Sequence, residues 1–282
     1  MMKINLISTY DEVNLGDDLL LYAAMNKYKN YSNIRVNGKK PTEIFIKRNA
    51  RQSKPHFRRL KLFYKNIYFG GTNFIFDKKE DAKLNFLRKI YYCFLARVFN
   101  IFLISNGITN FSKGFECFYK FCCDISVRDY ESRKILSSKG IQSSFKRDPV
   151  ISLFKERDVL FSDKEIFKDV GNIIILLGNQ INLDPEAKSL KLGSKLISLN
   201  QFTHIIFFQD GEFIELSSDL TRIKVLIYDG SLESLKLILK TIRSANSIQS
   251  MRLHGILLAK LYGIKAKAIP INSKLKRKYV GV

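Results

Sequence analysis

The chain has no tryptophan, three histidines and four cysteines among its 282 residues. Cys93, Cys117, Cys122 and Cys123 form no CxxC pair and no Cys/His cluster with zinc spacing. This pattern excludes a zinc-finger domain and a disulfide-rich secreted domain, and we expect no metal site. We interpret the four cysteines as reduced thiols in a cytoplasmic protein.

Long apolar segments are missing as well. Residues 1–8 lack the apolar run of a signal peptide and are expected to form a strand. Residues 86–105 are the most apolar region, but Arg88, Lys89 and Arg97 interrupt it. Because a bilayer span needs about 20 apolar residues, this region is not expected to cross a membrane, although it suits a membrane surface.

Acidic residues are few: 26 Asp and Glu stand against 48 Lys and Arg, which gives a formal charge of +22. Such an excess attracts nucleic acid, acidic lipid headgroups or phosphorylated substrates. Enrichment in lysine, isoleucine, phenylalanine and asparagine is also typical of an AT-rich genome. Eight of the cations fall in residues 47–65, among aromatic and aliphatic residues. We expect this segment to be an exposed loop or an amphipathic helix that suits an anionic bilayer.

Segments with strand and helix patterns alternate along most of the chain. Strands are expected at residues 3–9, 43–46, 66–69, 101–105, 124–127, 172–177, 204–208, 224–228 and 247–250. Helices are expected at residues 17–28, 81–99, 129–138, 231–243 and 252–262, and a turn at residues 147–149. A polar stretch at 155–168 is interpreted as a linker. The order predicts an α/β protein of two Rossmann-like domains, residues 1–155 and 170–282, whose parallel sheets face a central cleft.

Candidate binding residues follow the expected strands, where the loops of a parallel sheet line a crevice. Asn14, Gly16 and Asp17 come after the first strand. Gly16 lets the backbone approach a ligand, while Asn14 and Asp17 suit contacts with sugar hydroxyls. A helix capped at Asp17 is the purely structural alternative.

Two further turns have glycine or asparagine at a strand end. Gly70, Gly71, Thr72 and Asn73 follow the strand at 66–69, and Asn106 follows the next strand. A glycine pair there exposes backbone N–H groups that suit oxyanions. The turn lacks the Lys-Ser/Thr of a nucleotide P-loop, so ATP is not expected. A tight structural turn is the alternative for both.

Two arginines and a histidine are the candidate charged groups. Arg128 ends the strand at 124–127, where it can clamp a carboxylate or phosphate, or brace the turn through an Arg–Asp pair. Arg252 and His254 begin the helix expected at 252–262, and the amino end of a helix favours an anion. His254 can exchange a proton near neutral pH, and packing against the sheet is its alternative role.

Taken together and in this order, the motifs resemble the polysaccharide pyruvyl transferase family over residues 3–275. The chain departs from the family pattern at Thr72 and Ser105, where glycine is frequent, and at residues 109–110, where Gly-Pro is frequent. The matching residues are Asn14, Gly16, Asp17, Gly70, Gly71, Gly107, Ile108, Val127, Arg128, Asp129, Ser132, Asp148, Pro149, Arg252, Leu253, His254, Gly255, Ala259, Gly263 and Lys274.

The resemblance implies a GT-B-like fold and a pyruvyl transferase that forms a ketal. Phosphoenolpyruvate is the implied donor and a sugar of a surface polysaccharide, or of its lipid-linked precursor, the implied acceptor. The N-terminal domain is expected to bind the acceptor and the C-terminal domain the donor. We expect no cofactor besides phosphoenolpyruvate as co-substrate, and no nucleic-acid partner. The expected location is the cytoplasm, at the inner face of the membrane, with peripheral contact to anionic lipid.

We assign roles to single residues as hypotheses, partly from the resemblance and partly from the residues themselves. His254 is expected to act as general acid and Asp17 as the base that deprotonates a sugar hydroxyl. The residues expected to bind the donor are Arg252, Leu253, Gly255, Arg128 and Lys274. The residues expected to bind the acceptor are Asn14, Gly16, Gly70, Gly71, Thr72, Asn73 and Asn106.

Two other functions stay open at this point. A GT-B glycosyltransferase with a nucleotide-sugar donor would share the fold and would need an acid that binds a ribose, for which Glu212, Glu215 and Asp229 are candidates. A basic nucleic-acid-binding protein would explain the charge and predicts steeply salt-dependent binding. The sequence has no helix-turn-helix, RNA-recognition or zinc-finger signature.

Overall fold

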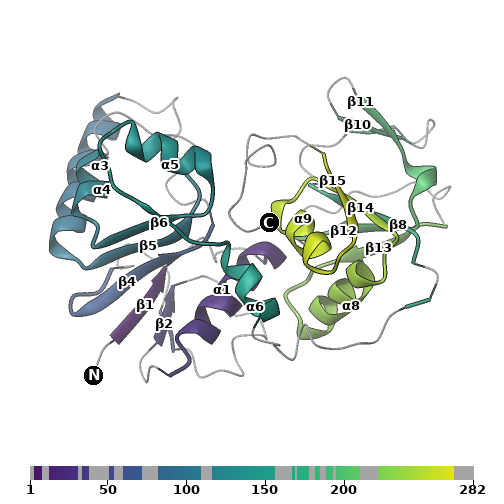
Figure 1. Ribbon diagram of the computed structural model, residues 1–282, viewed down its shortest axis with the longest axis horizontal. Helices are drawn as coiled ribbons and strands as arrows, with labels where there is room; N and C mark the ends of the chain where they lie inside the picture. Colours follow the sequence, from purple (N-terminus) through teal and green to yellow (C-terminus); the bar gives the residue numbers. More distant parts are fainter. Residues whose placement is uncertain are drawn as a thin grey trace.

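The computed structural model describes two parallel sheets with helices packed around them (Figure 1). The first sheet comes from the first half of the chain and the second sheet from the second half. The described residues are 3–7, 13–30, 34–37, 51–53, 60–71, 82–108, 116–155, 167–168, 170–177, 182–184, 189–192, 195–209 and 222–269.

The N-terminal sheet is formed by β1 (Lys3–Ile7), β2 (Ile34–Asn37), β3 (Arg51–Ser53), β4 (Tyr64–Phe69), β5 (Ile101–Asn106), β6 (Asp124–Val127) and β7 (Ser144–Phe145). Their order is β3-β2-β1-β4-β5-β6-β7, and all neighbours are parallel. Its inner strands are mostly apolar because both faces are covered. The buried amide of Asn5 donates to Oδ1 of Asn66 at 2.7 Å, which fixes the register of β1 against β4.

The helices of this half are α1 (Leu15–Lys27), α3 (Ala82–Val98), α4 (Glu116–Phe121), α5 (Tyr130–Ser137) and α6 (Pro149–Lys155). Side chains fix two of their starts. Asp129 accepts a hydrogen bond from the backbone N–H of Ser132 at 2.7 Å and caps α5. Asp148 accepts from the N–H of Val150 at 3.1 Å, directly before Pro149, the first residue of α6.

The C-terminal sheet is parallel as well, in the order β13-β12-β8-β14-β15. Its strands are β8 (Asn172–Leu176), β12 (His204–Phe207), β13 (Lys224–Ile227), β14 (Ser247–Ser250) and β15 (Lys265–Ala268), and its helices are α8 (Leu232–Arg243) and α9 (Leu253–Leu261). A small antiparallel sheet of β9 (Asn182–Asp184), β10 (Ser189–Leu192) and β11 (Lys195–Ser198) precedes the short 3-10 turn η2 (Leu199–Gln201).

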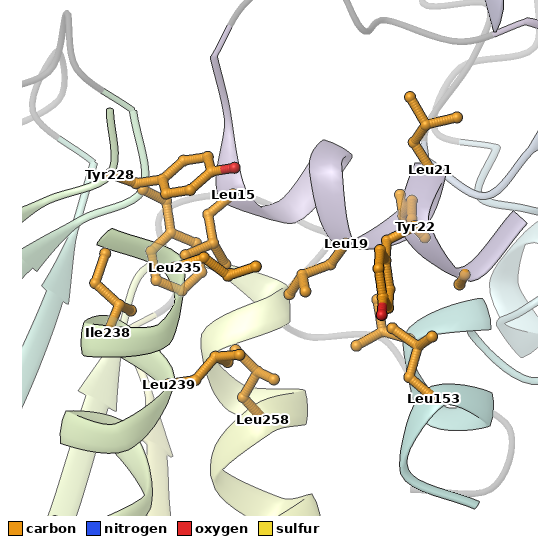
Figure 2. Close-up of a cluster of buried hydrophobic side chains, with 14 of the residues drawn as sticks. Leu15, Leu19, Leu21, Tyr22, Leu153, Tyr228, Leu235, Ile238, Leu239 and Leu258 are labelled. Carbon is orange, nitrogen blue, oxygen red and sulfur yellow. The ribbon is translucent and has the colours of Figure 1, made fainter. Parts of the chain in front are cut away.

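A continuous hydrophobic core joins the two sheets. α1 is buried along most of its length and lies between the sheets, beside α6 (Figure 1). Figure 2 shows Leu15 of α1 near Leu235 of α8, and Tyr22 of α1 near Leu153 of α6; all four belong to one buried cluster. A helix that packs against both sheets fixes their relative placement through apolar burial.

Most of the expected strands and helices are present, with shifts of one to three residues at their ends. One expectation was wrong and another held in part. Arg147 and Asp148 lie in the connection before α6, but Pro149, the last residue of the expected turn, is already the first residue of that helix, because Asp148 caps it and proline suits its first position. Residues 51–53 and 64–65, within the expected basic loop or helix, lie in β3 and β4. The expected strand 43–46 and most of the linker 155–168 lie outside the described residues, and the domain boundaries stay a prediction.

Candidate functional site

The amino end of α1 contacts the C-terminal sheet, although the helix follows a strand of the N-terminal sheet. The backbone N–H of Leu15 donates to the carbonyl of Phe208 at 2.8 Å, and Asn14 forms an antiparallel bridge with Gln209. Asn14 also caps the helix, because its side chain accepts from the N–H of Gly16 at 2.9 Å. Since Phe208 and Gln209 directly follow β12, α1 begins at the carboxyl edge of the C-terminal sheet.

Gly16 lies against the imidazole of His254, the second residue of α9. A β-carbon at position 16 would be 2.3 Å from His254 Nδ1 and 3.2 Å from Cε1. The first of these distances is shorter than non-bonded atoms tolerate, so the ring can approach this closely only because residue 16 is glycine. The contact places the ring of His254 at the amino end of α1, where the helix dipole favours negative charge.

On its other side, His254 faces a buried ion pair. Its Nε2 is 3.8 Å from Asp148 Oδ2, which is too long for a hydrogen bond but close enough for electrostatic attraction when the ring is protonated. The same oxygen accepts from Nη1 of Arg128 at 2.5 Å. The Asp148 side chain is fully buried, whereas 12% of the His254 side chain is exposed, although its Nε2 atom is itself buried.

The Asp148 carboxyl stays ionised in this environment. Burial alone would raise the pKa of Asp148, but the Arg128 guanidinium and the His254 ring together hold it well below its usual range. A permanent carboxylate therefore stands next to the imidazole of His254. Its position can orient the ring, as a general acid or base requires.

Strand ends of both sheets supply these groups. Arg128 directly follows β6 and Asp148 lies shortly after β7, both in the N-terminal half, while His254 follows β14 of the other sheet. The carboxyl edges of the two sheets thus meet at this cluster. In open α/β sheets ligands bind at this edge, so Arg128, Asp148, His254 and Gly16 form the candidate site.

The turn before α9 places Arg252 beside the site. The hydroxyl of Ser250 accepts from the N–H of Arg252 at 3.0 Å and donates to its carbonyl at 2.8 Å. Arg252 is the residue before the first turn of α9, and both Arg252 and Leu253 are half-buried. Gly255 is buried against Ser250 Oγ and Ile175, so its contacts are those of a helix packed on a sheet.

The two acids of the first turn of α1 have different surroundings. Asp17 is half-buried, whereas Asp18 is buried and its Oδ2 accepts from the hydroxyl of Tyr228 at 2.6 Å. Figure 2 shows the Tyr228 hydroxyl directed toward α1. Burial raises the pKa of the Asp18 carboxyl to about 7, with a smaller contribution from Asp17, while the hydrogen bond from Tyr228 opposes the shift. Tyr228 follows β13, so this hydrogen bond also ties α1 to the C-terminal sheet.

Gly70 and Gly71 directly follow β4, and Asn106 is the last residue of β5, so the three residues form neighbouring strand ends. Gly70 and Gly71 have φ of +66° and +70°, and a β-carbon on Gly70 would be 2.5 Å from Leu20 of α1. The amide of Asn106 donates to the carbonyls of Tyr68 at 2.8 Å and Ile104 at 3.1 Å. These contacts support the sheet, and acceptor binding by the three residues stays a prediction.

Three of the expected site residues lie outside the described residues: Thr72, Asn73 and Lys274. In the part of the chain that the structure describes, no three His, Cys, Asp or Glu side chains gather as a metal site would require. Within the same ranges, every helix is too short or too polar to serve as a membrane span. A hollow of about 560 Å³ near Tyr119, Asp124 and Ser144 lies at the amino ends of β6 and β7 and contains none of the candidate site residues.

Three polar residues at or next to the site receive no role from the sequence: Asp148, Asp18 and Tyr228. Asp148-Pro149 is one of the motifs shared with the family, and an acid before proline is also an N-cap signal that marks the start of a helix. The pairing of Asp18 with Tyr228 joins residues 210 positions apart, and no local signal points to it.

Comparisons with known proteins agree with the sequence motifs. A family model described as polysaccharide pyruvyl transferase matches residues 14–273. No curated protein is significantly similar in sequence. Among solved structures, the chain is similar to the functionally uncharacterised protein KP1_0663 from Klebsiella pneumoniae subsp. pneumoniae NTUH-K2044. That match has a TM-score of 0.54 and 14% identity, and it covers 97% of this chain and 85% of the other; at this identity it shows a shared fold alone.

Proposed function

Because the chain belongs to the polysaccharide pyruvyl transferase family and is therefore a transferase, we propose that it moves pyruvate from phosphoenolpyruvate to a sugar as a ketal. Family membership implies a polysaccharide acceptor. The observation that carries the proposal is the position of His254 between Asp148 of one half and Gly16 at the amino end of α1. A compact polyanion fits a site made of cations, a helix end and a titratable ring.

In the proposed reaction, one molecule of phosphoenolpyruvate reacts with two hydroxyls of the sugar. His254 gives a proton to the methylene carbon of phosphoenolpyruvate, which becomes a methyl group. One hydroxyl adds to the adjacent carbon, phosphate leaves, and the second hydroxyl closes the ketal. Of the two protons that the hydroxyls lose, one returns to His254 and the other leaves with inorganic phosphate.

The geometry of the ring supports Nδ1 as the nitrogen that exchanges the proton. Nε2 faces the buried carboxylate of Asp148, whereas Nδ1 faces the amino end of α1. Asp148 then orients the ring through its carboxylate. Arg252 is proposed to bind the donor. Arg128 is proposed to bind the donor as well, and also to position His254 by holding Asp148 in place. Asp17, half-buried in the first turn of α1, is the proposed base that takes the proton of one sugar hydroxyl and passes it to the departing phosphate.

We further propose a GT-B-like arrangement, with residues 1–155 on the acceptor side and residues 170–282 on the donor side. Leu253, Gly255 and Lys274 complete the proposed donor side. The proposed acceptor is lipid-linked and modified at the inner face of a membrane. The residues proposed on the acceptor side are Asn14, Gly16, Gly70, Gly71, Thr72, Asn73 and Asn106.

The test is to incubate the protein with phosphoenolpyruvate and a panel of glycosides, and to follow phosphate release and the mass of the products. We expect the mass of a glycoside to increase by one pyruvate less water. The His254→Gln variant should lose this activity while its thermal unfolding midpoint stays unchanged. EDTA should leave the rate unchanged, because the proposed site uses protein groups alone. Stabilisation by UDP but not by phosphoenolpyruvate would instead indicate a nucleotide-sugar glycosyltransferase.

A further inference from the structure

Exposed apolar side chains gather at the amino edge of the N-terminal sheet, the edge opposite the candidate site. Leu62 and Phe63 precede β4, Val98 precedes β5, and Phe121 precedes β6. Their exposed fractions are 55%, 88%, 42% and 40%, and Phe94 on the outer face of α3 is 61% exposed. We call these five residues the amino-edge patch. Contiguous exposed apolar residues are uncommon on soluble proteins and mark interaction surfaces.

The turn that carries Phe63 is held by buried polar contacts. Oδ1 of Asn66 accepts from the N–H of Lys61 at 2.9 Å, and its amide donates to the carbonyls of Lys61 at 3.0 Å and Tyr64 at 3.2 Å. Phe63 itself has φ of +64°, a conformation that bulky residues rarely adopt. Such backbone strain persists only where the surrounding structure enforces it, and it is frequent at functional surfaces. The fold therefore holds this phenylalanine outward.

Side-chain contacts join α3 and α4, the helices that carry Phe94, Val98 and Phe121. The Arg97 guanidinium lies 5.5 Å from the centroid of the Phe121 ring, and the rings of Tyr92 and Phe118 join the two helices at 6.0 Å. Leu60, next to the turn, packs on the same core cluster as these helices. Figure 1 shows α3 and α4 on the outer side of the N-terminal sheet, away from α9.

Positive charge surrounds the patch. α3 contains no aspartate or glutamate, and Lys61, Lys65, Arg97 and Lys120 lie next to the apolar residues in the chain. The two acids of α4 and of the start of β6 are already paired. Glu116 is 4.0 Å from Lys139, and Asp124 is 3.1 Å from Lys146.

We propose that the amino-edge patch binds the surface of an anionic lipid bilayer, with Phe63 and Phe94 in the headgroup region and the surrounding cations on acidic headgroups. Apolar insertion combined with basic side chains is the combination that gives stable peripheral binding. A second copy of the chain fits less well, because lysine is depleted in protein interfaces and two copies of charge +22 repel each other. The inference stands apart from the transfer chemistry.

Flotation with vesicles tests the proposal. The protein should float with phosphatidylcholine vesicles that contain one quarter phosphatidylglycerol, and not with pure phosphatidylcholine. Phe94→Ser and Phe63→Ser should each weaken this binding about tenfold, because each removes one inserted ring. Raising the salt to 0.5 M should weaken it further, because salt screens the cations.

The matched control is Leu237→Ser on α8, which removes a helical apolar side chain of 43% exposure from the other half of the molecule and should leave binding unchanged. His254→Gln should also float like the wild type, so the outcome is independent of the transfer activity. Equal recovery with both vesicle types would overturn the proposal, as would wild-type binding by both phenylalanine variants. A wild-type dimer that Phe94→Ser converts to monomer would assign the patch to self-association instead.

Discussion

Gly16→Ala should remove most of the transfer activity while the protein stays folded. The new β-carbon would lie 2.3 Å from His254 Nδ1, so the ring has to move by about 1 Å to reach ordinary contact distance. A displacement of about 1 Å at a catalytic group costs roughly 100-fold in rate, or about 2.7 kcal/mol of transition-state stabilisation. The backbone conformation at position 16 suits alanine, because Gly16 lies in the first turn of α1 and alanine is a good helix former.

The assay is phosphate release from phosphoenolpyruvate in the presence of acceptor, with kcat and KM measured separately. Because the ring moves while Arg252 stays in place, kcat should fall much more than KM rises. The free energy of unfolding, measured in urea, should stay within about 1 kcal/mol of the wild type. The higher helix propensity of alanine offsets part of the energy that the close contact with His254 costs. Circular dichroism should show an unchanged spectrum.

Gly171→Ala is the matched control. Its β-carbon would lie 2.8 Å from Thr203 Cγ2, at the amino end of β8 and far along the strand from His254. It should cost some stability and leave kcat/KM unchanged. If Gly16→Ala retains wild-type kcat/KM, the contact between α1 and His254 has no part in catalysis, and the geometric argument for this site fails.

Three further predictions concern stability. Asp18 keeps its proton up to about pH 7 in the folded state but only up to about pH 4 when unfolded. The free energy of unfolding should therefore fall by about 3 kcal/mol from pH 5 to pH 8 in the wild type, relative to the Asp18→Asn variant. Urea titrations in which the two proteins show the same pH dependence would contradict this prediction. Asp148→Asn leaves the buried Arg128 without its carboxylate and should cost about 3–5 kcal/mol, measured by urea unfolding at pH 7. Ser105→Gly should raise the unfolding midpoint by about 2–4 °C in a thermal scan, because a serine at φ of +55° costs about 1 kcal/mol.

The central strands were predictable because their sequences differ from everything around them. Asn172–Leu176 is almost entirely isoleucine and leucine, as expected for a strand covered on both faces. The edge strands gave no such signal. Lys265–Ala268 alternates lysine with alanine, which protects an open sheet edge but is indistinguishable from a polar loop in sequence.

The candidate site was predictable only in parts. Arg252 and His254 could be identified because a helix start after a strand is a local pattern. Asp148 could not be linked to them, because its contact with His254 depends on how two sheets from different halves of the chain meet. The pair of Asp18 and Tyr228 is of the same kind: each residue is ordinary in its own segment, and only the docking of α1 brings them together.

The length of the N-terminal strands has a consequence for the proposed membrane contact. β4 and β5 have six residues each, about 20 Å end to end, with the amino-edge patch before them and the candidate site after them. A protein seated on a bilayer through that patch would hold its reactive centre about this far above the lipid surface. A single sugar attached directly to its lipid carrier could not span the gap. On the two proposals above, a lipid-linked acceptor is therefore expected to be an oligosaccharide several units long and to be modified away from its lipid end.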